Sequence, residues 1–136
     1  MDTCSLTYSP NHDIVFVRWL APDTFAQVQH TYRQALVLAL AHRCGSWLLD
    51  ARHAGGIRHE ETLWLSHAFF PQAVAELAPR PLRMAVLSSA QRLAQMHADA
   101  AVAPAVQAAI AATQPYEAAI FMGEADAVGW LRAPAG

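Results

Sequence analysis

The stretch 46–52, with the sequence SWLLDAR, constrains the fold more than any other part of the chain. Trp47, Leu48 and Leu49 form a short apolar run, and the polar residues Asp50 and Arg52 follow it. A strand that is apolar on both faces is typical of a parallel sheet covered on both sides. Ligands in open α/β sheets bind at the carboxyl ends of the strands. The stretch therefore predicts a central parallel strand, with residues 50–53 at the edge of the sheet where a ligand would bind.

The other segments predict the partners of this strand. Short apolar or alternating runs predict strands at residues 6–8, 14–20, 82–87 and 118–122. Turn-forming residues at 9–13 predict an antiparallel hairpin between the first two. Apolar residues at helical spacing predict helices at residues 24–44, 59–77, 90–112 and 124–132. We therefore expect one α/β domain over residues 1–136, in which a mixed sheet of about five strands starts with the hairpin and continues with βαβ units whose helices pack on the sheet.

Glycine, proline and serine mark where these helices should stop, bend or begin. Gly45 is predicted to end the first helix. Pro71 should kink or split the second helix, because proline lacks an N–H and clashes with the preceding turn. Pro104 should divide the alanine-rich segment 90–113 into a short piece and a main helix. Ser88 or Ser89 can cap the helix that follows its strand.

Composition excludes several classes of protein. A chain of 136 residues that is 54% hydrophobic and 15% charged can bury a core and is not disordered. Its net charge of −2 predicts no nucleic-acid partner, and all nine basic residues are arginine, which excludes lysine chemistry. The N-terminus lacks the pattern of a signal peptide, and the longest apolar stretch, residues 35–41, is too short to span a membrane. We expect a cytoplasmic protein without a membrane span.

Several segments together resemble the STAS-like family of small bacterial proteins, which has the fold of the anti-sigma-factor antagonists. The resemblance covers nearly the whole chain and rests on VRW at 17–19, WLLDAR at 47–52, FP at 70–71, MAVLS at 84–88, a strand ending at Phe121 and WL at 130–131. It implies that fold and a kinship to lipid-transfer domains that hold apolar ligands between helices and sheet. STAS regulators carry a phosphorylated serine in the loop after a strand. Because residues 50–57 contain no hydroxyl side chain, we expect no phosphorylation switch there.

The candidate ligand-binding residues lie at predicted strand ends and on the helix with Pro71. Asp50 and Arg52 are two residues apart, so their side chains point to the same face and could bind a polar ligand. The alternative, that they form a structural pair, is favoured because polar strand ends are common. Trp64 and Phe70 could form an apolar wall, although aromatic residues at helical spacing more often fill a core. The full set is Asp50, Arg52, His53, Trp64, Phe70 and Ser88.

No metal site, cofactor or catalytic residue is predicted. His59 and His67 are two helical turns apart, which is too far for one tetrahedral metal site. His53 does not form a metal-binding spacing with either of them. Ser88 and Ser89 lack the GxSxG pattern of a nucleophile. For these histidine and serine residues, a structural role is therefore favoured over a catalytic one.

These observations predict a small non-catalytic module that binds an apolar or other small ligand or a protein partner, with a regulatory role open to it. A homo-oligomeric interaction domain such as a homodimer is the second interpretation, and an enzyme of unknown reaction is the third. A partly empty cavity between the helix containing Trp64 and the sheet would favour the ligand. Excess apolar surface would favour association, and converging groups with shifted pKa values would favour the enzyme.

Overall fold

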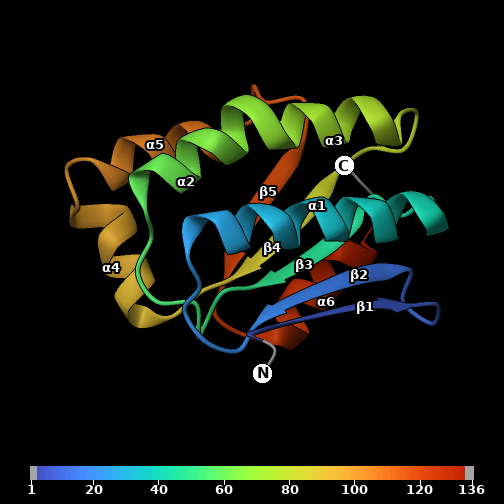
Figure 1. Cartoon of the computed structure of the whole chain (residues 1–136), viewed down its shortest axis with the longest axis horizontal. Coiled ribbons are helices and arrows are strands. Elements are labelled where there is room, and N and C mark those ends of the chain that lie inside the picture. Colours follow the sequence, from blue (N-terminus) through green and yellow to red (C-terminus); the bar gives the residue numbers. More distant parts are fainter. Residues whose placement is uncertain (1–2, 134–136) are drawn as a thin grey trace.

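The computed structural model describes residues 3–133 and contains one five-stranded sheet (Figure 1). The strands lie side by side in sequence order and are β1 (Cys4–Ser9), β2 (Ile14–Trp19), β3 (Ser46–Asp50), β4 (Arg83–Leu87) and β5 (Glu117–Phe121). β1 is antiparallel to β2, and every later neighbour is parallel. The predicted α/β fold, with its mixed sheet and N-terminal hairpin, is confirmed.

Helices cover both faces of this sheet (Figure 1). They are α1 (Phe25–His42), α2 (His59–Trp64), the π-helical turn η1 (Leu65–Phe69), α3 (Phe70–Leu77), α4 (Ala90–Ala98), α5 (Val102–Ala109) and α6 (Glu124–Arg132). α1, α3 and α5 pack on one face, and α6 packs on the other. We call these the α1 face and the α6 face. Between residues 3 and 133, no helix has both the length and the apolar character needed to cross a membrane.

The central strand β3 places alternate side chains in the two cores. Trp47 and Leu49 pack with the cluster on the α1 face, and Leu48 packs with α6. The Trp47 side chain is fully buried, and its Nε1 donates a hydrogen bond to the Cys44 carbonyl at 3.1 Å. This arrangement confirms a strand that is covered on both faces.

The second helix splits at a π-helical turn immediately before Pro71, which confirms the predicted break. The Phe70 N–H donates to the Leu65 carbonyl, five residues back, instead of four. A proline must break the regular hydrogen-bond pattern of the turn before it, and a wider turn accommodates that break. Because of the extra residue in this turn, the neighbours Phe69 and Phe70 are both buried.

The prediction that Gly45 ends the first helix is wrong. α1 ends at His42, and Arg43 adopts the left-handed backbone conformation there, with φ of 51°. Gly45 is needed for a different reason: a Cβ atom at this position would lie 2.0 Å from the Pro81 carbonyl oxygen. The close approach of two backbone segments, rather than helix capping, therefore requires a glycine here.

The alanine-rich segment divides just before Pro104, as predicted, but into two helices of nine and eight residues rather than a short piece and a main helix. α4 ends at Ala98, and Asp99 Oδ1 accepts hydrogen bonds from the N–H groups of Ala101 and Val102 at 2.9 and 3.0 Å. This carboxylate starts α5, in which Pro104 is the third residue and needs no internal hydrogen bond. α5 ends at Ala109, three residues earlier than predicted.

Arginine side chains hold α6 at both ends. At its C-terminus, Arg83 Nη1 donates to three backbone carbonyls at 3.1 to 3.3 Å, those of Trp130, Leu131 and Ala133. The Arg83 guanidinium also lies 4.2 Å from the centre of the Trp130 ring. At the other end, Arg18 Nη1 lies 2.7 Å from Oε1 of Glu124, the first residue of α6. The negative charge of Glu124 at the N-terminus of α6 and the positive charge of Arg83 at its C-terminus are each stabilised by the helix dipole.

Candidate functional site

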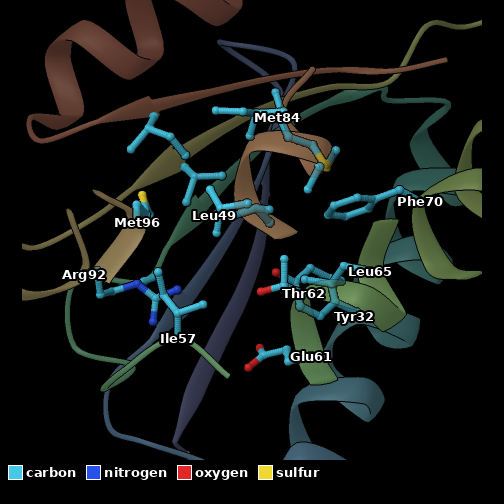
Figure 2. Close-up of a pocket in the computed structure, with 17 residues that line it drawn as sticks. Tyr32, Leu49, Ile57, Glu61, Thr62, Leu65, Phe70, Met84, Arg92 and Met96 are labelled. Carbon is cyan, nitrogen blue, oxygen red and sulfur yellow. The ribbon is translucent and has the colours of Figure 1, made fainter. Parts of the chain in front are cut away.

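A cavity of about 100 Å³ lies between the α1 face of the sheet and the helices above it (Figure 2). The strands and the segments that follow β3 contribute Leu49, Ala51, Ile57, Met84, Val86, Ala118 and Ile120. The helices and the end of α5 contribute Tyr32, Glu61, Thr62, Leu65, Phe70, Arg92, Met96, Val106, Ala109 and Ile110. Most of these side chains are apolar, so the cavity is suited to an apolar molecule.

Local sequence explains why this space is unfilled. Ala109 and Ala118 line the cavity with single methyl groups where larger side chains would reach across it. The η1 turn supplies Leu65 to the lining, and Phe70 follows directly after it. α2 packs against α5, and both helices contribute residues to the lining. The unfilled volume thus depends on small residues on β5 and α5 and on the π-helical turn.

One end of the cavity is polar. Figure 2 shows that Arg92 of α4 and Glu61 of α2 approach this end from opposite sides. Glu61 Oε2 lies 3.7 Å from Arg58 Nη1. Arg92 Nη1 donates to the Gly55 carbonyl at 2.8 Å, whereas Arg92 Nε is buried without a hydrogen-bond partner. Within residues 3–133, no ion pair joins Glu61 to Arg92.

Burial shifts the pKa values of the groups at this end. It raises the pKa of Glu61, and the nearby charges of Arg92 and Arg58 oppose that rise. It also raises the pKa of the Tyr32 hydroxyl and lowers the pKa of Arg92. Each shift favours the uncharged form, which shows that water solvates this end of the cavity poorly.

A smaller cavity of about 30 Å³ adjoins the first and shares Tyr32, Ala51, Glu61 and Arg92 with it. Trp19 also lines the smaller cavity, and its side chain is only 4% exposed. The Trp19 Nε1 atom is buried and has no hydrogen-bond partner among residues 3–133. Two unpartnered N–H donors, Trp19 Nε1 and Arg92 Nε, therefore belong to side chains around one small polar space. We call this space the polar end.

The predicted pair Asp50 and Arg52 lies elsewhere, in an ion-pair cluster on the α6 face. Arg52 Nη2 and Arg18 Nη1 lie 2.8 and 3.0 Å from Asp50 Oδ2. Burial alone would raise the pKa of Asp50, but hydrogen bonds from Arg52 and Arg18 outweigh it and lower the pKa. With Glu124 bound to the same Arg18, the cluster fastens the start of α6 to the sheet. Its contacts are those of the structural pair, which was the favoured alternative.

The other predicted site residues are distributed around the fold. Phe70 lines the cavity. Trp64 packs against Phe25, Tyr32 and Phe69 and is not among the lining residues. His53, which follows β3, is exposed. Ser88, which follows β4, is buried, and its Oγ has no hydrogen-bond partner among residues 3–133.

Sequence reasoning missed Tyr32, Glu61 and Arg92 as cavity residues. Glu61 lies in the first turn of α2, where an acidic residue is expected from the helix dipole alone and gives no separate sign of a cavity. Arg92 offered a usable signal, because it lies four residues before the buried Met96 and therefore on the same side of α4. A charge on the buried side of a predicted helix needs a polar or functional reason.

The described residues, 3–133, contain no group of three or more histidine, cysteine, aspartate or glutamate side chains placed to hold a metal ion. The chain matches no family model, no curated protein and no solved structure.

Proposed function

We propose that this protein is a small ligand-binding module that holds a largely apolar molecule in the cavity between the sheet and the α2–η1–α3 helix. The unfilled volume of about 100 Å³ carries this proposal. Protein interiors are close-packed and contain few voids larger than a water molecule. Side chains around an unfilled space lose packing contacts, which costs free energy. A bound apolar molecule would recover part of that free energy. The resemblance to the STAS-like family, with its kinship to lipid-transfer domains, supports the same reading.

The surface gives less support to a self-associating domain. The large apolar side chains with the greatest exposure are Leu20, Val37, Leu63 and Met122, which are one each on four different segments. Single exposed apolar residues are normal on soluble proteins and define no interface.

The polar end supports a second candidate, an enzyme. Tyr32, Glu61 and Arg92 converge there, and all three have shifted pKa values. Such clusters occur at catalytic sites, and a carboxyl group with a raised pKa can act as a general acid or base. The second candidate is therefore acid–base chemistry by Glu61 on the molecule in the cavity.

Two measurements test the proposal. Native mass spectrometry of protein purified from its source should reveal a bound small molecule. Titration of ligand-free protein with toluene, followed by two-dimensional NMR of backbone amides, should give saturable shifts at Met84, Val86 and Ile120 but not at the exposed Val37. A protein that carries no molecule and shows no saturable shift would contradict the proposal. Steady chemical conversion of the molecule found in the native protein would favour the enzyme instead.

A further inference from the structure

We propose that the natural ligand carries an uncharged head group that both accepts and donates hydrogen bonds, such as an alcohol or a primary amide, and that this group sits between Glu61 and Arg92. The inference depends on the proposed ligand-binding function and specifies the chemical class of the ligand. Its apolar body would occupy the larger cavity, and its head group would occupy the polar end.

The charges around the polar end favour a head group without net charge. Four charged side chains line the smaller cavity, two acidic and two basic: Asp23, Glu61, Arg58 and Arg92. A carboxylate ligand would face Glu61 and Asp23 in a poorly solvated space, and an ammonium ligand would face the two arginines. Burying a charge without its own partner is strongly unfavourable. A neutral group meets neither obstacle.

The hydrogen-bonding groups at the polar end require both an acceptor and a donor from the ligand. Trp19 Nε1 and Arg92 Nε are buried N–H donors without partners. Nearly all buried donors in proteins have a partner, either a protein group or an ordered water, so an oxygen atom of a ligand placed here would satisfy them. On the opposite side, the Glu61 carboxylate can accept hydrogen bonds, and its one ion pair with another residue of the described range 3–133 is the 3.7 Å contact with Arg58. The oxygen of an alcohol or amide can accept from the donors, while its O–H or N–H group donates to Glu61.

The size of the cavity limits the apolar body to about one ring. An apolar protein cavity of about 150 Å³ is known to hold benzene. The present cavity, at about 100 Å³, is about one third smaller, and the adjoining space adds about 30 Å³, so one ring is the upper limit. A single ring with a one-carbon polar substituent is therefore a suitable probe.

Five probes with the same ring separate the possible outcomes: toluene, benzyl alcohol, benzamide, benzoate and benzylammonium. Their dissociation constants for the ligand-free protein can be measured by NMR titration at neutral pH. We expect benzyl alcohol and benzamide to bind about tenfold more tightly than toluene, since hydrogen bonds to charged groups contribute about 1.5–3 kcal/mol. We expect benzamide to bind more tightly than benzoate, which has nearly the same shape but carries a negative charge.

Two variants test whether Glu61 and Arg92 cause this preference. Arg92→Met should reduce the ratio of benzamide to toluene affinity to near one, whereas Gln91→Met, at the exposed neighbouring position, should preserve it. Glu61→Gln should remove repulsion and narrow the gap between benzoate and benzamide, whereas Glu60→Gln on the exposed side of the same turn should not.

The outcomes distinguish this inference from the proposed function. If toluene binds in the cavity and the polar probes bind no more tightly, the head-group inference is wrong and the binding function stands. Tighter binding of benzoate or benzylammonium than of benzamide would refute the uncharged class. If none of the five probes binds and the protein purified from its source carries no molecule, the proposed function itself fails.

Discussion

Filling the cavity should abolish ligand binding without unfolding the protein. Ala118 on β5 lines the cavity, and Ala118→Ile would add three carbon atoms to a strand position that suits a β-branched residue. Each buried methylene contributes about 0.8 kcal/mol, or roughly 2.4 kcal/mol for three. Imperfect fit in a packed region costs about 1–3 kcal/mol. The two effects nearly cancel, so the free energy of unfolding should change by less than about 1.5 kcal/mol.

Binding responds differently from stability, because three added carbons occupy much of a cavity of about 100 Å³. We expect Ala118→Ile to weaken toluene binding at least about tenfold, measured by NMR titration, while urea denaturation shows a folded protein of near-normal stability. Ala119→Ile is the matched control, since the next residue of a strand points to the opposite face. Unchanged toluene binding in Ala118→Ile, or an equal loss in Ala119→Ile, would refute the cavity as the binding site.

Three further predictions concern stability, and each can be measured by chemical denaturation. Trp47→Ala should cost about 3–5 kcal/mol, because this side chain is fully buried; a loss below about 1 kcal/mol would contradict its central place in the core. Arg83→Met should cost about 2–4 kcal/mol, because it removes the hydrogen bonds from Arg83 to α6. Glu117→Gln breaks only the half-exposed ion pair with Arg83 and should cost less than about 1 kcal/mol. Equal losses in the two variants would show that the ion pair contributes more than the contacts to α6. Folding raises the pKa of Glu61, so the folded state holds the carboxyl proton more tightly than the unfolded chain does. The free energy of unfolding should therefore fall as the pH rises from the ordinary carboxyl range through the raised pKa. Glu61→Gln should remove this part of the pH dependence, and an unchanged pH profile would contradict the raised pKa.

The order and type of the elements could be predicted because local patterns determine them. The hairpin follows from turn residues between two apolar runs, and α6 spans residues 124–132 as its apolar spacing predicts. Pro71 indicated a break in the second helix, and the π-helical turn occurs at that point. These features depend on residues close together in the sequence, so they require no knowledge of tertiary packing.

The cavity could not be predicted, because an empty space depends on side chains from several elements at once. Ala109 and Ala118 are separated along the chain and line the cavity from α5 and β5. In the sequence each is an ordinary small residue. Whether the space between them is filled depends on where α5 sits above the sheet, and no local pattern specifies that distance.

The placement of Asp50 followed from information that the sequence does contain. Side chains alternate along a strand, so Leu49 and Asp50 must face opposite sides of the sheet. Successive parallel strands lie next to one another in chain order, and right-handed crossovers then place every connecting helix on the same face. The cavity under those helices receives Leu49, and Asp50 must face α6. A ligand under the connecting helices and a ligand held by Asp50 were therefore incompatible predictions.

This alternation also explains how one small sheet can combine a firmly fixed face with an incompletely filled one. The charged side chains Arg18, Asp50 and Arg83 lie on β2, β3 and β4, and β3 and β4 also carry residues that line the larger cavity. Arg83 contacts the C-terminus of α6 directly, whereas Asp50 is linked to its first residue, Glu124, through Arg18. Their hydrogen bonds fix α6 at both ends and need no unfilled space. Side chains on the α1 face can therefore change in size without altering the ion pairs and hydrogen bonds that hold α6. Substitutions that alter the contacts of α6 should therefore change stability, whereas substitutions such as Ala118→Ile should change ligand binding. Mutations on the two faces of the sheet should have nearly additive effects on the free energy of unfolding, because the substituted residues share no partners.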